Sequence, residues 1–175
     1  MPIGTPILEH AVATAVPTIS VAAPTPEQLA VDPTDDDVVA YPTLAAAVAA
    51  HEADAVSDDE QLRCLAGAIY FESRGEPLAG QLAVAEVILN RAASGRFADS
   101  PCGVVTQRGQ FSFVRGGQIP SVPDNANYRR AVAVAKVAMK EAWESKAGDA
   151  LYFNAGRGSA GRVRIASIGN HNFYR

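Results

Sequence analysis

The sequence predicts an α+β domain that is mainly helical, with a short antiparallel β element and a disordered tail before it. Apolar residues recur at helical spacing in three stretches: 57–73, 78–93 and 124–146. Two short stretches near the C-terminus, 150–154 and 163–166, have the composition of strands. The first 42 residues hold seven of the eleven prolines, so we expect residues 1–42 to be disordered.

Charge divides the chain into an acidic part and a basic part. Eleven acidic residues and no basic ones precede Arg63, whereas fifteen basic and eight acidic residues follow from it onward, a net of +7 (15 − 8). We expect residues 43–56 to form a short helix or linker with Thr43 as its N-cap, and residues 57–175 to form the folded domain.

A basic domain suggests an anionic polymer as its partner, or a set of arginines that only solvate the surface. Nucleic acid and peptidoglycan are both anionic polymers. Arg129 and Arg130 are the only adjacent basic pair, and no zinc-finger, RNP or helix-turn-helix pattern occurs. We therefore expect no nucleic-acid partner.

The first helix has recognisable start and stop signals. Ser57 with Glu60 three residues later is a capping box and predicts a start at Ser57. Gly75 suits the position after a helix, and Pro77 cannot continue it, so the helix should end near residues 73–74.

Glu72 falls in the last turn of this helix. At 100° per residue it lies about 20° from Leu65 and about 60° from Ile69 around the axis, on the apolar face. Burial and the negative end of the helix dipole both raise the pKa of a carboxyl, which suits a general acid. The alternative interpretation is a structural ion pair of Glu72 with Arg74 or Arg91.

After the break, residues 78–93 should form the second helix, with Glu86 either solvated or paired with Asn90. Residues 96–123 are rich in glycine and proline and should be mostly irregular. Within them, residues 110–113 alternate polar and apolar side chains like a short strand or an extended loop. Residues 124–146 read as the long core helix, and residues 168–171 as the segment that closes the chain.

No metal or cofactor site is expected, because His10, His51 and His171 lie too far apart to show ligand spacing. The two cysteines, Cys64 and Cys102, fit either one disulfide in an oxidising compartment or two buried thiols.

No stretch is long and apolar enough to span a membrane. A signal peptide is not evident either. Residues 1–25 contain no Lys or Arg, and Glu9, His10 and Pro17 interrupt the only apolar stretch there.

Three separated blocks resemble one known family. They are AIYFESRGEPLAGQLAVAEVILNR (residues 68–91), GQFSFVRGG (109–117) and IGNHNFYR (168–175). In this order they resemble the cell wall hydrolase family typified by the spore cortex-lytic enzymes, over about residues 57–175. The resemblance implies a small lysozyme-like fold that cuts peptidoglycan glycan strands as a lytic transglycosylase, with Glu72 as its catalytic residue.

The resemblance also implies the remaining site residues. Gln110 and Ser112 would line the glycan groove and bind sugar. Tyr152 and Asn154 are the nearest match to a Tyr-Asn element opposite the acid, although Y-F-N departs from an adjacent pair, and His171 completes the substrate-binding set. The resemblance favours the disulfide and a periplasmic or secreted protein, and we expect a monomer without cofactors.

With this resemblance we expect a lytic transglycosylase that cleaves between N-acetylmuramic acid and N-acetylglucosamine with Glu72 as sole acid and base. One alternative is a hydrolytic muramidase, in which water attacks and Glu76 assists. The other is a non-catalytic peptidoglycan-binding or scaffold protein.

Overall fold

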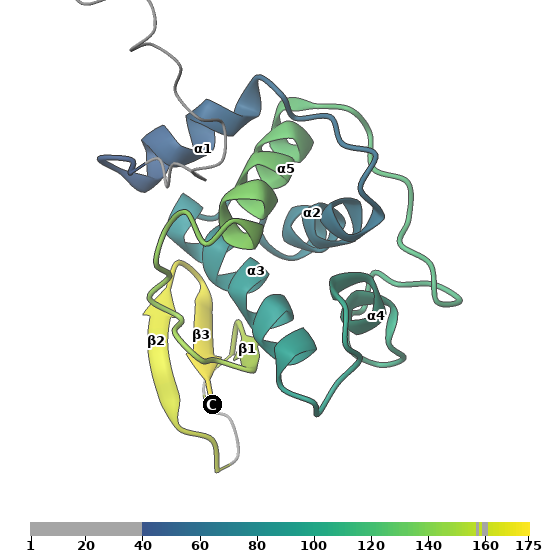
Figure 1. Cartoon of the computed structure of the whole chain (residues 1–175). Coiled ribbons are helices and arrows are strands. Elements are labelled where there is room, and N and C mark those ends of the chain that lie inside the picture. Colours follow the sequence, from purple (N-terminus) through teal and green to yellow (C-terminus); the bar gives the residue numbers. More distant parts are fainter. Residues whose placement is uncertain (1–39, 157, 159–160) are drawn as a thin grey trace, which may run out of the picture. The chain divides into compact units, whose positions relative to one another are not determined.

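The computed structural model describes residues 40–156, 158 and 161–175. Within these residues the elements are α1 (Leu44–Glu52), α2 (Glu60–Ser73), α3 (Leu78–Ala93), α4 (Pro101–Thr106), α5 (Ala126–Met139), β1 (Tyr152–Asn154), β2 (Arg164–Ile168) and β3 (His171–Tyr174) (Figure 1). The predicted α+β class, mainly helical with a small antiparallel sheet, is confirmed. Most of the predicted 1–42 tail, residues 1–39, lies outside the described residues.

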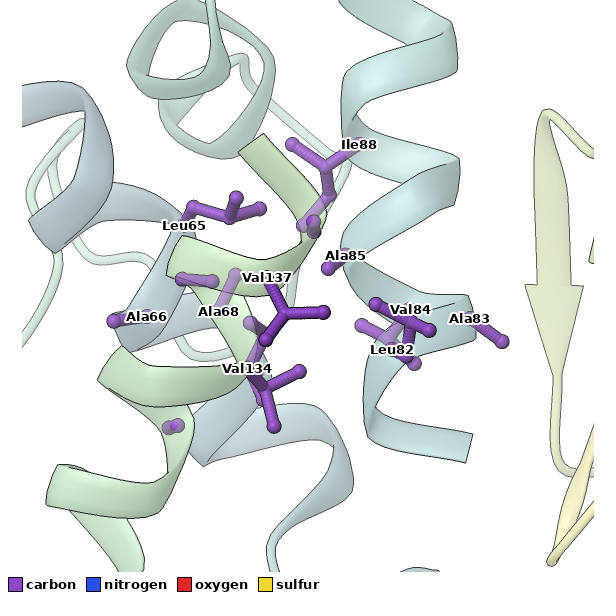
Figure 2. Packing of buried hydrophobic residues seen from close by; sticks show 14 of the residues in the cluster. Leu65, Ala66, Ala68, Leu82, Ala83, Val84, Ala85, Ile88, Val134 and Val137 are labelled. Atoms are coloured by element: carbon purple, nitrogen blue, oxygen red, sulfur yellow. The ribbon is translucent and has the colours of Figure 1, made fainter. Parts of the chain in front are cut away.

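Helices α2, α3 and α5 pack against one another and form the core. Figure 2 shows Leu65 of α2, Ile88 of α3 and Val137 of α5 converging with several alanines, and all three are fully buried. Burying a Leu, Ile or Val side chain contributes roughly 1.5–3 kcal/mol, so this three-helix contact is the main source of stability.

Helix α2 begins later than the capping box predicts. Its N-cap is Asp59, whose Oδ1 accepts from the backbone N–H groups of Gln61 (2.8 Å) and Leu62 (3.4 Å). Ser57 accepts from the Asp59 N–H instead, so its hydroxyl shapes the turn before the helix. The predicted end is confirmed, because α2 stops at Ser73 and the chain turns through Gly75 at φ 86°.

The loop after α3 contains α4, a short helix that the predicted irregular region 96–123 did not include. Ser100 caps it by accepting from the Gly103 N–H, and Pro101 occupies its first turn. A disulfide between Cys64 of α2 and Cys102 of α4 joins the two helices, with Cα atoms 5.1 Å apart. Helix α3 itself spans the predicted 78–93.

Helix α5 is shorter than the predicted 124–146. The N–H of Ala142 donates to the carbonyl of Val137 and that of Glu141 to Ala138, the two bonds of a Schellman motif. Glu141 takes the left-handed conformation (φ 51°) that glycine adopts most easily, so no glycine marks this end in the sequence. The predicted helical face beyond Met139 therefore belongs to a turn, in which Ala142 and Trp143 still pack on the core.

Helix α1 packs against α5 and buries Ala47 and Val48. Thr43 caps α1 as predicted, by accepting from the Ala46 N–H. Tyr41, which falls inside the predicted tail, also packs against the core. No helix in the described ranges is long and apolar enough to cross a membrane.

The sheet has the order β1-β3-β2, with both pairs antiparallel. β3 is the central strand, and the prediction missed it by ending the chain in a closing segment at residues 168–171. Both β1 and β2 contact α3, which therefore lies between the sheet and the helices α2 and α5 (Figure 1). This arrangement brings the C-terminal strands against α3, the helix that also packs on α2.

Candidate active site

Glu72 lies in the last turn of α2, one residue before the helix ends. Ser73 is buried and its hydroxyl donates to the Ile69 carbonyl at 2.9 Å, which ties the last turn together. Arg74 then adopts an extended conformation and Gly75 a left-handed one, so the chain leaves the helix axis at once. The carboxyl of Glu72 is thus held at a sharp, well-defined helix end.

Burial dominates the electrostatics of Glu72. Its side chain is half-buried, and the loss of solvent raises the pKa of the carboxyl above its ordinary value, while the positive charge of Arg91 acts in the opposite direction. Glu72 takes part in none of the ion pairs formed among the described residues. Arg74, the other predicted partner, instead places its guanidinium 5.0 Å from the centre of the Tyr70 ring.

Arg91, in the last turn of α3, is the buried cation of the site and only 6% exposed. Its Nε donates to the Leu151 carbonyl at 2.7 Å and its Nη1 to Oε1 of Gln110 at 3.3 Å. Its guanidinium also lies 5.0–5.8 Å from the ring centres of Phe97, Phe111 and Tyr152. Arg91 therefore joins α3, the loop after α4 and the start of β1 beside Glu72.

Sequence reasoning considered Arg91 only as an ion-pair partner of Glu72. Its links to Gln110 and Leu151 depend on residues 19 and 60 positions away. No local pattern reports such contacts. The only signal in the sequence is a basic residue at the end of a strongly apolar helix, a position at which arginine more often faces solvent.

The loop after α4 contributes Gln110 and a group of aromatic rings. Gln110 is partly exposed and its carbonyl oxygen is held by Arg91. Phe113 stacks on Phe71, the neighbour of Glu72, with ring centres 4.8 Å apart, and Phe111 lies 5.5 Å from Phe113. Ser112, which lies between Phe111 and Phe113 in the sequence, is exposed. The loop is thus packed onto the end of α2 by Phe113.

Tyr152 and Asn154 lie on β1 and have different surroundings. The ring of Tyr152 lies among arginines: Arg91 at 5.8 Å, Arg162 at 3.9 Å, and Arg96 Nη2 donating to its hydroxyl at 3.3 Å. The amide nitrogen of Asn154 donates to the Gly158 carbonyl at 3.1 Å. Its Oδ1 is buried and has no hydrogen-bond partner among the described residues.

His171 starts β3 and is buried. Its ring lies 5.3 Å from that of Phe153, and its Nδ1 is a second buried polar atom without a partner in the described part of the chain. Side chains alternate along a strand, so Asn154 does not share the face on which Phe153 and His171 meet. The structure thus places Tyr152 beside Arg91 and Gln110, and it separates Asn154 from His171.

Glu76 anchors the turn between β2 and β3. Its two carboxylate oxygens accept from the backbone N–H (2.9 Å) and the side-chain amide (2.6 Å) of Asn170. These bonds, the backbone one above all, lower the pKa of Glu76. Gly169 has a positive φ of 58°, and a Cβ there would collide with the Glu76 carboxylate. Both carboxylate oxygens of Glu76 are therefore engaged in structure.

Glu86 is not the solvated residue or the partner of Asn90 that the sequence suggested. Burial and, second, the negative charge of Glu141 raise its pKa to about 7. Asn90 instead donates to the carbonyls of Gly148 (2.8 Å) and Ala150 (3.1 Å). Glu86 and Arg91 are five residues apart and point about 140° away from each other around α3. Glu86 thus faces away from the Arg91 side of the helix.

Within the described residues, no three His, Cys, Asp or Glu side chains are grouped as a metal site. The chemistry that the arrangement offers is that of a half-buried carboxyl next to aromatic rings, a buried arginine and a set of amide groups. A carboxyl whose pKa is raised by burial can give a proton to a substrate and take one back.

Comparison with known proteins gives the family. Residues 75–174 match the family model described as Cell Wall Hydrolase, a match that starts three residues after Glu72. The spore cortex-lytic enzyme of Bacillus subtilis is 39% identical over 131 residues, which cover 73% of this chain and 41% of that protein. That of Halalkalibacterium halodurans is 40% identical over 119 residues, 66% of this chain and 34% of that protein. The chain therefore spans about two fifths or less of the length of these relatives.

Solved structures agree with this assignment. The catalytic domain of the germination-specific lytic transglycosylase SleB from Bacillus anthracis is 35% identical, with a TM-score of 0.55, and the match covers 68% of this chain and 97% of that one. The catalytic domain of the Bacillus cereus SleB protein is also 35% identical, with a TM-score of 0.53 and coverages of 69% and 96%. The resemblance stated from the sequence blocks is confirmed, and this chain belongs to the cell wall hydrolase family.

Proposed function

We propose that this chain cleaves peptidoglycan glycan strands between N-acetylmuramic acid and N-acetylglucosamine as a lytic transglycosylase, with Glu72 as sole acid and base. The observation that carries the proposal is the half-buried Glu72 at the end of α2, with its pKa raised by burial. The family assignment and the similarity to the solved catalytic domain of a lytic transglycosylase support the reaction class.

The proposed reaction needs one carboxyl. Glu72 protonates the glycosidic oxygen as the bond to C1 of N-acetylmuramic acid breaks. The resulting carboxylate takes the proton of the C6 hydroxyl of the same sugar, whose oxygen attacks C1. The product carries a 1,6-anhydro end, and Glu72 is again protonated. The aromatic rings beside Glu72 would exclude water, which favours attack by the internal hydroxyl.

The surroundings of the other carboxyls support a single acid. Glu76, the candidate helper of a hydrolytic muramidase, has both oxygens bound by Asn170. Asp124 and Asp149 form ion pairs with Arg129 and Arg175. Inverting and retaining glycosidases need a second free carboxyl at a defined distance from the first.

The other side chains would position the glycan. Gln110, whose carbonyl oxygen is held by Arg91, has its amide N–H groups left for a sugar, and the exposed Ser112 offers a hydroxyl. The unpartnered Oδ1 of Asn154 and Nδ1 of His171 are buried polar atoms that a bound ligand or water would satisfy. Tyr152 contacts three arginines, two through its ring and one through its hydroxyl.

We also propose that the protein acts as a monomer in the periplasm or after secretion, where its substrate lies. The division into a tail (residues 1–42), a helical linker (43–56) and a catalytic domain (57–175) remains our proposal. The packing of Tyr41 and α1 on the core shows that the last part of the tail and the linker segment contact the domain.

Mass spectrometry of the muropeptides released from purified sacculi tests the proposed function. A lytic transglycosylase leaves 1,6-anhydro ends, which are lighter by one water than the reducing ends that a muramidase leaves. If only reducing ends are released, the protein is a hydrolytic muramidase and the lytic transglycosylase proposal is wrong. Binding of sacculi without any release would support the scaffold protein.

A further inference from the structure

Two exposed arginines from distant parts of the chain meet at one tyrosine. Arg96, in the loop after α3, donates from Nη2 to the Tyr152 hydroxyl at 3.3 Å. Arg162, in the segment before β2, has its guanidinium carbon 3.9 Å from the centre of the Tyr152 ring, close enough for a cation–π contact. Both side chains are exposed to solvent, while the ring between them is half-buried. Tyr152 thus fixes the positions of two cations at the surface.

The charge of this arrangement is not compensated within the described residues. The ion pairs there involve Arg129, Arg130 and Arg175, and neither Arg96 nor Arg162 is among them. A third guanidinium, that of Arg91, lies 5.8 Å from the same ring. Three cations around one ring repel each other, and the uncharged contacts with Tyr152 hold two of them in place. An anion placed between the two exposed guanidinium groups would relieve that repulsion.

The arrangement is also close to the proposed catalytic residue. Arg91 is the cation that acts on Glu72 and at the same time a neighbour of Tyr152. Arg91 is thus a common neighbour of Glu72 and Tyr152, so a strand bound across Glu72 can extend to Tyr152. A peptidoglycan strand carries its negative charge on the carboxylates of its peptide stems, because the lactyl carboxyl of each N-acetylmuramic acid is joined to a stem as an amide.

We propose that Arg96 and Arg162, arranged by the Tyr152 ring, form a subsite for a carboxylate of the peptide stem. This inference rests on the proposed function, since it takes peptidoglycan as the substrate. A guanidinium donates two parallel hydrogen bonds to a carboxylate, so two of them can hold one carboxylate from both sides. The subsite would make the chain prefer strands that carry stems over bare glycan.

Binding of the full chain to sacculi tests this subsite without depending on cleavage. The Glu72→Gln protein is sedimented with native sacculi and with sacculi whose carboxyl groups have been amidated. The same is done with Arg96→Gln/Arg162→Gln and, as a matched control, Arg63→Gln/Lys140→Gln, both in the Glu72→Gln background. The control removes two exposed cations that are not among the arginines at Tyr152 and form none of the ion pairs among the described residues.

We expect amidation of the sacculi to weaken binding of the Glu72→Gln protein and of the control about 10-fold. Amidation should weaken binding of the Arg96→Gln/Arg162→Gln protein less than about 3-fold. Equal ratios for all three proteins would overturn the subsite. Soluble glycan strands stripped of their stems by an amidase provide the second arm as competitors in the sedimentation assay, because their only carboxylates are lactyl. If these strands compete as strongly, and with the same dependence on the arginine pair, as soluble strands that keep their stems, the stem assignment is wrong.

The outcomes separate this inference from the proposed function. If the unsubstituted chain releases anhydro products but the arginine pair does not affect binding, only the subsite fails. If the chain releases nothing but the arginine pair still determines the preference for native sacculi, the subsite stands and the catalytic proposal fails. Thermal unfolding of each variant shows whether the substitutions leave the fold intact.

Discussion

The last turn of α2 and the middle of α3 each hold a half-buried glutamate, yet the charges that act on the two carboxyls have opposite signs. Glu72 faces the buried Arg91 and lies next to stacked aromatic rings. Glu86 faces Glu141, and its pKa is raised to about 7. Among the described carboxyls, that of Glu86 has the largest pKa shift, and the charge that acts on it is that of another acid. The nearest amide along its helix face, that of Asn90, is bound to the carbonyls of Gly148 and Ala150.

This difference shows that a raised pKa alone does not identify a catalytic acid. Burial penalises the charged form of any carboxyl, in structural as well as functional positions. At Glu72 the penalty is moderated by Arg91, which also holds Gln110 and β1 in place. At Glu86 the nearby Glu141 adds to the penalty, so the carboxyl is simply costly to ionise.

The largest expected effect is the difference in activity between variants of the two glutamates. Glu72→Gln should lower the rate of release from sacculi by about 10²–10⁴-fold, because proton transfer by a placed side chain contributes that much. Glu86→Gln is the matched control and should stay within a few-fold of the unsubstituted protein. A similar loss in both variants, or none in Glu72→Gln, would remove the distinction between the regions.

The disulfide gives α2 a covalent support that α3 does not have. Cys64 and Cys102 are 38 positions apart, so closing this loop should contribute roughly 3–4 kcal/mol to the free energy of unfolding. Denaturant unfolding with and without reductant measures the loss, and a Cys64→Ala/Cys102→Ala variant should not respond to reductant. Alkylation of both thiols in non-reduced protein from an oxidising compartment would contradict the bond.

Arg91→Met should lower activity by about 10–100-fold, because Gln110 and the start of β1 lose their anchor. A general acid works in its protonated form, so the rate falls as pH rises through its pKa. Arg91 lowers the pKa of Glu72, and its removal therefore moves the high-pH limb of the rate profile to higher pH.

Arg91→Lys provides the control for charge. It keeps the cation, so the high-pH limb should move much less than in Arg91→Met, although the planar hydrogen-bonding fork is lost. A limb that shifts equally in both variants would show that packing, and not charge, sets the pKa of Glu72.

The smallest effect concerns stability at Glu86. Its pKa in the folded protein is about 7, above the ordinary 4.5. The contribution of protonated Glu86 to the free energy of unfolding is fully present below pH 4.5 and is lost as pH rises through about 7. Glu86→Gln should therefore raise the free energy of unfolding at pH 8 by about 1 kcal/mol, after allowance for solvent screening of a half-exposed group.

Thermal unfolding at two pH values measures this difference. The gain of about 1 kcal/mol corresponds to a rise in Tm of roughly 3 °C at pH 8, and at pH 4 the two proteins should unfold together. Glu144→Gln, at an exposed acid, should show no pH-dependent gain. A gain at pH 4 as large as that at pH 8 would contradict the burial of a titrating Glu86.

Local signals in the sequence were enough to predict the position of Glu72. The helical spacing from Leu65 and Ile69 and the break at Gly75 and Pro77 place it in a last turn on the apolar face, where the structure also has it. Helix α3 was predictable for the same reason, because apolar periodicity and caps act within a few residues. The three sequence blocks identified the family.

The tertiary structure alone decided what surrounds that glutamate. Arg91 becomes a buried anchor because the Leu151 carbonyl and Gln110 come to it from elsewhere in the chain. Helix α5 ends at Met139 through a left-handed glutamate where the sequence has no glycine, and β3 exists because β1 and β2 pair with it from both sides. Hydrogen bonds and strand pairs between distant residues depend on how the whole chain packs, and a local pattern contains no record of them.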